Sequence, residues 1–177
     1  MDNMKEHYII DGYNCIYAWK EFQPLMNDWD AARDKLIDIL MEYGAYEKFL
    51  MTVVFDAWKV ENEDRIDEVR IYSDIFEVIY TAFEETADSR IERLAYECVR
   101  KNQEVHVVSS DAVVESMILG AGAYRHPARE FRRMVKRTKQ QLRDKYLSNV
   151  TLPLIRHEVS DKLDADTLEL LEKLRRK

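Results

Sequence analysis

Four short apolar runs in this chain each end in, or lead directly into, acidic residues. The runs and the acids that follow them are 8–10 with Asp11, 53–55 with Asp56, 78–80 with Glu84, Glu85 and Asp88, and 107–110 with Asp111. If the runs are neighbouring parallel strands, their carboxyl ends lie at one edge of the sheet, where open α/β sheets bind ligands. Carboxylates that converge at that edge can bind a divalent metal ion.

Helical segments alternate with these runs. Apolar stripes at helical spacing predict helices over 28–46, 87–101 and 112–119, between expected strands over 8–11, 50–55, 76–82 and 105–109. Asp28 or Asp30 can cap the first helix and Thr86 the second. The acidic stretch 61–65 is expected to be a loop, and the segment from there to Ser73 either continues it or forms a short irregular helix. Alternating strands and helices specify a parallel sheet covered on both faces. We therefore predict an α/β fold with three α/β/α layers and a central, mainly parallel sheet.

The C-terminal part of the chain is expected to be helical and basic. After a break at 120–122, a helix is predicted over 127–146, with Pro127 in its first turn. A run at 152–155 contains Pro153 and would be an edge strand, and a terminal helix is predicted over 164–176. For 177 residues, 46% of them hydrophobic, we expect a single domain over 1–177 with its core at about 7–157.

The composition predicts a cytoplasmic protein with reduced cysteines. No stretch reaches the roughly 18 consecutive apolar residues of a membrane span, and the N-terminus lacks the pattern of a signal peptide. Cys15 and Cys98 are too few and too far apart for a disulfide framework or a zinc site. We expect both to be core or near-core thiols.

Bases dominate residues 125–145, although the formal net charge of the chain is −7. The basic residues of this segment are Arg125, Arg129, Arg132, Arg133, Lys136, Arg137, Lys139, Arg143 and Lys145. The segment is either a solvated helical face or a track for the phosphate backbone of a nucleic acid. Its position directly after the last acidic strand end favours the nucleic-acid interpretation.

The first two acids also have structural interpretations. Asp11 precedes Gly12, and Asp-Gly is a common turn pair. Asn14, on the same expected loop, adds an amide that can bind a metal through water or orient a phosphate. Asp56 can equally be structural, an indirect ligand or a direct one.

The later acids likewise have both structural and functional interpretations. Asp88 falls on the buried side of a first helical turn, where the helix dipole favours an acid even without a ligand. Glu84 and Glu85 are interchangeable on sequence alone, and one of them is expected to be plain loop. Asp111 can cap the next helix, but the preceding serines favour a cluster of hard oxygen ligands.

Six segments in this order also form a recognisable set of motifs. They are Ile10-Asp11-Gly12-Tyr13-Asn14, Val54-Phe55-Asp56-Ala57, Glu85-Thr86-Ala87-Asp88-x-Arg90-Ile91-Glu92, Val108-Ser109-Ser110-Asp111, Gly120-x-Gly122-Ala123-x-Arg125 and Ala128-Arg129-Glu130. The set, which spans most of the chain, resembles the YacP-like NYN-domain proteins, a branch of the PIN-like nucleases. The chain departs from that family in a longer, more acidic stretch at 59–75 and at Cys15 and His126, which have no matched position.

The resemblance implies a PIN-like fold and a bacterial, metal-dependent endoribonuclease. Its expected substrate is RNA, mRNA in particular, and the ribosome is a candidate partner. The acidic site of the family maps onto four residues of this chain with an amide beside them, namely Asp11, Asp56, Asp88, Asp111 and Asn14.

Phosphodiester hydrolysis needs charge neutralisation and an activated water, which carboxylate-held Mg²⁺ or Mn²⁺ supplies. We hypothesise that Asp11, Asp88 and Asp111 hold the metal. Asp56 would be an additional or indirect ligand, and Asn14 would orient substrate or water.

RNA phosphates would be contacted by the basic segment, through Arg125, Arg129, Arg132, Arg133 and Lys136. Spacings of three and four would put Arg125, Arg129 and Arg132 on one helical face if the helix extends that far. The four histidines are scattered along the sequence and offer no obvious catalytic pair.

Aromatic residues near the first two acidic runs can stack on unpaired bases or belong to the core. They are Tyr13, Tyr17, Trp19 and Trp58.

Two rival functions differ in class. A non-catalytic RNA-binding module of the same fold would bind RNA without cutting it. A phosphohydrolase of the haloacid dehalogenase kind needs a second Asp two residues after the first, where this chain has Tyr13. This sequence has no glycine-rich phosphate-binding loop of the kind that nucleotide hydrolysis uses. The sequence predicts no oligomeric state.

Overall fold

A computed structural model describes residues 6–56, 68–82, 84–111, 118, 120 and 122–150, with side chains as far as residue 147. The chain divides into two compact units, Met1–Thr138 and Lys139–Lys177. The described part of the second unit is the end of helix α5 (Ala128–Val150), where Gln140 donates a hydrogen bond to Asp144 (2.9 Å). The elements predicted at 152–155 and 164–176 lie outside the described residues. A single domain over 1–177 stays a prediction.

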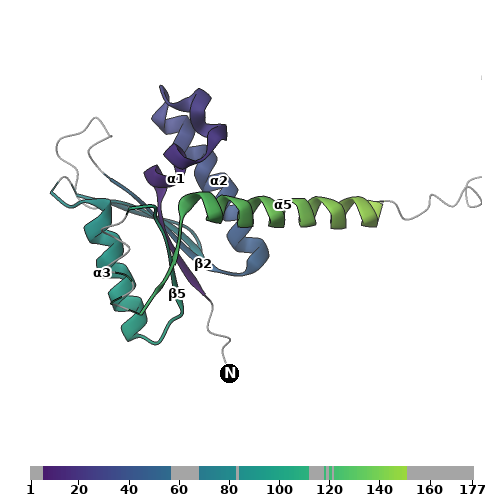
Figure 1. Cartoon of the computed structure of the whole chain (residues 1–177). Coiled ribbons are helices and arrows are strands. Elements are labelled where there is room, and N and C mark those ends of the chain that lie inside the picture. Colours follow the sequence, from purple (N-terminus) through teal and green to yellow (C-terminus); the bar gives the residue numbers. More distant parts are fainter. Residues whose placement is uncertain are drawn as a thin grey trace, which may run out of the picture. The chain divides into compact units, whose positions relative to one another are not determined.

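The described residues of the first unit form a six-stranded sheet in the order β3-β4-β2-β1-β5-β6 (Figure 1). Its strands are β1 (His7–Asp11), β2 (Leu50–Phe55), β3 (Glu68–Ser73), β4 (Phe76–Tyr80), β5 (Val105–Val108) and β6 (Tyr124–His126). All neighbours pair in parallel except β3, which pairs antiparallel with β4 at one edge. The prediction of an α/β fold with a mainly parallel sheet is confirmed.

The helices cover both faces of this sheet (Figure 1). They are α1 (Gly12–Ala18), the 3-10 helix η1 (Lys20–Leu25), α2 (Trp29–Glu47), α3 (Ala87–Arg100) and the start of α5. Successive residues of a strand point to opposite faces. Tyr8 and Ile10 therefore pack in a core with α1, η1, α2 and α5, while Ile9 packs in a second core with α3. These are the predicted three layers.

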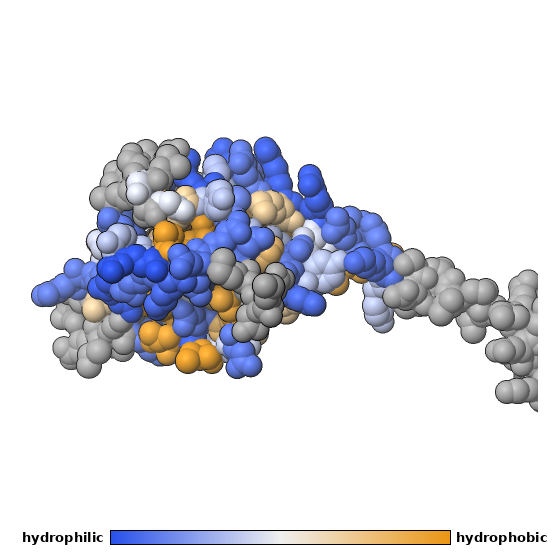
Figure 2. All heavy atoms as spheres, turned by 90° about the horizontal axis from the view of Figure 1, so that it is seen from below, coloured by the Kyte–Doolittle hydropathy of each residue, from blue (hydrophilic) through white to orange (hydrophobic). Residues whose placement is uncertain are grey.

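The surface, unlike these two cores, is mostly hydrophilic. On the face seen in Figure 2, hydrophilic residues cover most of the area and hydrophobic ones gather in separate small patches. Cys15 and Cys98 are both buried free thiols. Within the described residues, no helix has the length and apolar character needed to cross a bilayer.

The structure corrects three local predictions. The expected loop after Asp11 is helix α1, because the Asp11 side chain accepts the backbone N–H of Asn14 (3.0 Å) and so caps a helix. The segment before Ser73, expected to be loop or a short irregular helix, is strand β3, an edge strand whose residues are mostly exposed and so give no apolar period. Pro127 lies just before α5 rather than in its first turn, and strand β6 ends directly before Pro127.

Other predictions hold within a residue or two. Asp28, not Asp30, caps α2, and Thr86 caps α3, each by accepting a backbone N–H three residues on. Residues 112–117, most of the helix predicted at 112–119, lie outside the described residues, although Ile118 and Gly120 are helical.

Gly12 lets β1 turn directly into α1 beneath the ring of Phe55. A Cβ atom at position 12 would lie 2.3–2.8 Å from three carbons of that ring, which is itself fully buried. The first turn of α1 therefore depends on the missing side chain.

Gly12→Ala is expected to lower the free energy of unfolding by about 1–3 kcal/mol, the usual cost of overpacking a core. Urea denaturation checks this. Gly120→Ala is the matched control, since no described atom lies within 4 Å of a Cβ built there, and it should change stability by less than about 1 kcal/mol. A Gly12→Ala protein as stable as the wild type would contradict the close contact.

Candidate functional site

A cleft of about 210 Å³ opens at the carboxyl edge of the sheet, between the ends of β1, β2 and the start of α3. All four predicted acids line it, together with Tyr13, Asn14, Tyr17 and Ala87. The acids come from separate parts of the chain, and parallel pairing of β1 with β2 and β5 places them at one edge. We call it the acidic cleft.

Asp11 lies half-buried at the end of β1. Its pKa is raised to about 6, first by burial and then by repulsion from Asp88, Asp56 and Asp111, against the opposing hydrogen bond from the Asn14 backbone. A cation bound among the four carboxylates would remove this repulsion.

Asp56 and Asp88 meet at the start of α3. One Asp56 carboxylate oxygen accepts the backbone N–H of Ala87 (3.4 Å), which ties the end of β2 to this helix. Asp88, half-buried in the first turn, has a raised pKa through burial and through repulsion from Asp111 and Asp56. Asp56 therefore has a structural contact at the start of α3, and its role as an additional or indirect ligand stays a prediction.

Asn14 connects α1 to the segment that follows β5. Its side-chain oxygen accepts the backbone N–H of Ser110 (3.1 Å). The backbone N–H of Asp111 in turn donates to the hydroxyl of Ser109 (3.1 Å). These bonds hold Asp111 at the cleft, and the amide nitrogen of Asn14 still carries N–H donors of its own.

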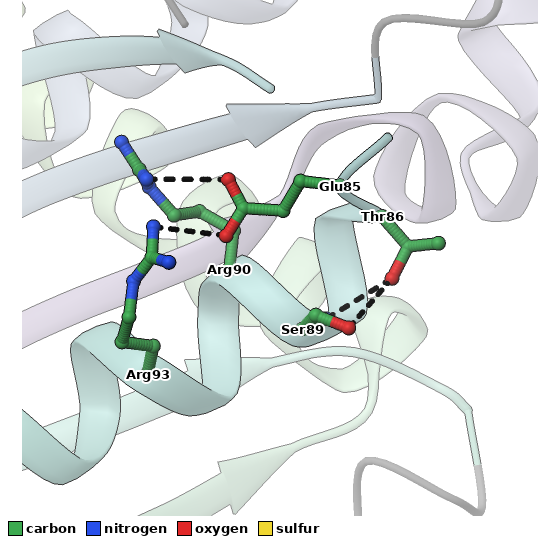
Figure 3. A network of polar contacts seen from close by, with 5 residues as sticks. All are labelled: Glu85, Thr86, Ser89, Arg90 and Arg93. Carbon is green, nitrogen blue, oxygen red and sulfur yellow. Dashed lines mark hydrogen bonds and ion pairs between the residues drawn. The ribbon is translucent and has the colours of Figure 1, made fainter. Parts of the chain in front are cut away.

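Glu84 and Glu85 do not line the acidic cleft. The two oxygens of Glu85 bind Arg90 Nη1 (3.2 Å) and Arg93 Nη2 (2.8 Å), as Figure 3 shows. Beside this pair, Thr86 caps α3 by accepting the backbone N–H of Ser89 (3.2 Å). Glu85 therefore stabilises the start of the helix that presents Asp88.

Comparison with known proteins identifies the family. Residues 8–176 match the model of the YacP-like NYN domain. The chain belongs to this family. It is 35% identical over 170 residues, 95% of either protein, to the uncharacterized protein YacP of Bacillus subtilis (strain 168).

Two solved structures are similar to this NYN domain. A crystal structure of a mutant of Rae1 (YacP) from Bacillus subtilis has a TM-score of 0.70 and 31% sequence identity, covering 96% of this chain and 99% of that one. Another crystal structure of Rae1 (YacP) from the same organism has a TM-score of 0.67 and 33% identity, covering 96% and 94%. The family resemblance is thus confirmed, and NYN domains belong to the PIN-like nuclease superfamily.

The predicted RNA-binding cations of this NYN domain do not all lie in one place, whereas its four acids line one cleft. Arg125 lies in strand β6, so the helix does not extend that far and Arg125 does not share a helical face with Arg129 and Arg132. Three residues between β5 and α5 are strand because they pair with β5, which helical spacing cannot reveal.

The four other predicted cations, Arg129, Arg132, Arg133 and Lys136, line a second cleft of about 410 Å³ with residues of α1 and η1. We call it the basic cleft. Arg132 is partly engaged there, because its guanidinium pairs with Glu21 and lies 4.8 Å from the ring of Trp19. Arg129, Arg133 and Lys136 are exposed.

The four aromatic candidates separate by burial. Tyr13 and Trp19 belong to the core, at 6% and 1% exposure, whereas Tyr17 is 56% exposed. Trp58 lies outside the described residues. Arg33 donates to the Tyr13 hydroxyl (2.8 Å), and the indole of Trp19 donates to the carbonyl of Ala128 (2.8 Å).

Two of the histidines lie close together, since His106 and His126 share a hydrogen bond of 2.9 Å. Their strands β5 and β6 pair in parallel, with His106 opposite Tyr124 and His126 opposite Val108, a pairing that the sequence did not reveal. His106 also lies 3.4 and 3.5 Å from carboxylate oxygens of Glu6 and Glu104, and these three side chains could hold a metal ion. Glu6 and Glu104 precede β1 and β5, so this group lies at the amino ends of the strands, opposite the acidic cleft.

Asp11→Asn is expected to stabilise the metal-free protein at pH 7 by roughly 1–3 kcal/mol. The pKa of Asp11 is raised from 3.8 to about 6 in the folded protein, so the folded state binds the proton more tightly than the unfolded chain. Stability from this group is greatest below about pH 4 and is lost as the pH rises through 6. Denaturation in EDTA at pH 4 and pH 7 measures the difference.

The gain should therefore be present at pH 7 and absent at pH 4. Asp38→Asn, at an exposed position of α2, is the control and should change stability by less than about 0.5 kcal/mol at either pH. Equal effects of Asp11→Asn at both pH values would contradict the raised pKa.

Proposed function

We propose that this NYN domain is a metal-dependent endoribonuclease that hydrolyses phosphodiester bonds of RNA. The observation that carries the proposal is the meeting of Asp11, Asp56, Asp88 and Asp111 in one cleft, beside a second cleft lined by cations. Membership of a nuclease superfamily supports the same chemistry. mRNA as the class of RNA and the ribosome as a partner stay predictions from the family resemblance.

The donor set fits Mg²⁺ or Mn²⁺, because both prefer carboxylate oxygens and retain water molecules. A volume of about 210 Å³ accommodates an ion with several waters, each of which occupies about 30 Å³. In the proposal Asp11, Asp88 and Asp111 hold the ion, which would supply charge neutralisation and activation of water when bound.

The remaining residues of the cleft position and orient. Asp56 holds the backbone of α3 through Ala87, which keeps Asp88 in place. Asn14 fixes the segment before Asp111 through Ser110, and its amide group faces the same cleft. It is suited to orient a phosphate oxygen or a water molecule.

The basic cleft supports RNA as the substrate. Arg129, Arg133 and Lys136 lie on successive turns of α5 and are exposed, as residues that contact a phosphate backbone must be. Arg132 is assigned to the wall of the cleft, because Glu21 and Trp19 hold its guanidinium. Arg125, on β6, stays a predicted phosphate contact.

Asp111→Asn should reduce cleavage of an end-labelled single-stranded RNA with Mn²⁺ or Mg²⁺ by about two orders of magnitude or more. A metal ion stabilises the transition state by several kcal/mol, and the substitution removes one of its charged ligands. RNA binding should persist. Asp38→Asn should cut like the wild type, and EDTA should abolish cleavage by both.

Full cleavage by Asp111→Asn would remove that residue from the site. RNA binding without any cleavage by the wild type, on free mRNA or on translating ribosomes, would instead favour the non-catalytic binding module. Cuts made only on ribosomes would show that the partner supplies specificity.

Arg129→Gln is expected to weaken RNA binding and to lower the slope of log Kd against log salt by about 0.7, the value for one phosphate contact on a single strand. Fluorescence anisotropy over a range of salt concentrations measures this slope. Arg100→Gln removes the same charge from the exposed end of α3 and should leave the slope unchanged. Equal slopes for all three proteins would remove Arg129 from the RNA interface.

A further inference from the structure

Tyr17 joins the two clefts. It lines the acidic cleft with Asp11 and Asp88, and it lines the basic cleft with Arg129 and Arg133. No other described residue lines both. An RNA strand that places one phosphate among the carboxylates and others against the cations must pass this side chain.

The ring of Tyr17 is exposed but held in place. It is 56% exposed, whereas Tyr13 on the same helix is buried. The ring of Tyr17 packs edge-on against Trp29 of α2, with centroids 5.5 Å apart and planes at 64°. A fixed and exposed aromatic ring is suited to stack on a nucleic-acid base, because every base has a flat face.

The position of the basic cleft relative to Tyr17 is fixed by the core. The indole of Trp19, two residues after Tyr17, donates to the carbonyl of Ala128 at the start of α5 (2.8 Å). Arg132 lies over the same indole and pairs with Glu21 of η1. These contacts join α1, η1 and the first turns of α5 within the first unit of the chain.

Charge divides the path at Tyr17. Carboxylates repel phosphates unless a cation is bound, whereas the basic cleft attracts them. While no cation is bound, a strand anchored in the basic cleft can be held at the entrance of the acidic one only by a contact that does not depend on charge. Stacking supplies such a contact.

We propose that Tyr17 is a positioning residue that stacks on one base of the RNA, between the phosphate in the acidic cleft and the phosphates in the basic cleft. A base within a duplex is already stacked and paired, so this contact selects an unpaired nucleotide. The proposal rests on the function proposed above and names the form of RNA that the site accepts.

Binding of a fluorescent single-stranded RNA of about ten nucleotides to Tyr17→Ala and Tyr17→Phe tests the proposal. All measurements use the Asp111→Asn background, so that the RNA is not cut. Tyr17→Ala should bind at least about fivefold more weakly, because stacking is lost, and Tyr17→Phe should bind within about twofold of its parent. Equal binding by all three proteins would overturn the proposal.

A set of the same RNA, with one nucleotide in turn made abasic, separates stacking from a general loss of structure. At one position, removal of the base should weaken binding to the parent protein by the same factor as Tyr17→Ala does. Tyr17→Ala should bind that abasic RNA as tightly as it binds the intact RNA. A loss for Tyr17→Ala that is independent of the abasic position would overturn stacking. If stacking is found but the wild type with Asp111 does not cut RNA, the proposed function fails while this inference stands.

Discussion

The parallel pairing of β1 between β2 and β5 is the constraint on which the rest of this molecule depends. Ile10 lies opposite Val53 on one side and Val108 on the other, so all three strands end at one level. These central strands are almost entirely buried, and the acids follow at the edge where burial ends. A slip of one residue in either pairing would exchange the faces of a strand between two different cores. The core therefore fixes the arrangement of the acids.

That arrangement has a cost for the folded protein without metal. The pKa of Asp11 is raised to about 6, first by burial and then by its acidic neighbours. Two backbone N–H groups offset part of this cost. The N–H of Asn14 donates to Asp11, and the N–H of Ala87, at the start of α3, donates to Asp56. Helix starts favour negative charge, yet repulsion among the carboxylates persists. A cation bound among these acids would relieve that repulsion.

The sequence predicts the buried part of this structure best. Runs such as Val53-Val54-Phe55 are apolar because both faces of their strand are covered, and the acid after each run marks where the strand ends. Thr86 and Asp28 have side chains that cap helices, so the sequence indicates where α3 and α2 begin. The four acids could be found in this way because a single rule, the common edge of parallel strands, brings them together.

Elements that depend on long-range pairing were missed. Strand β6 has three residues and exists because β5 lies beside it, which places Arg125 in a strand and His126 against His106. The exposed edge strand β3 has no buried residue to give a clear period. Local sequence also could not show that Arg132 is held by Glu21 and Trp19, or that Tyr17, unlike Tyr13, stays at the surface.

Crystals of the protein soaked in Mn²⁺ would test the central claim most directly, by anomalous scattering from the bound ion. We predict a peak within about 2.0–2.6 Å of carboxylate oxygens of Asp11, Asp88 and Asp111, the distance expected for hard cations. A peak confined to Glu6, Glu104 and His106 at the opposite end of the strands, with none in the acidic cleft, would contradict the assignment of that cleft as the metal centre.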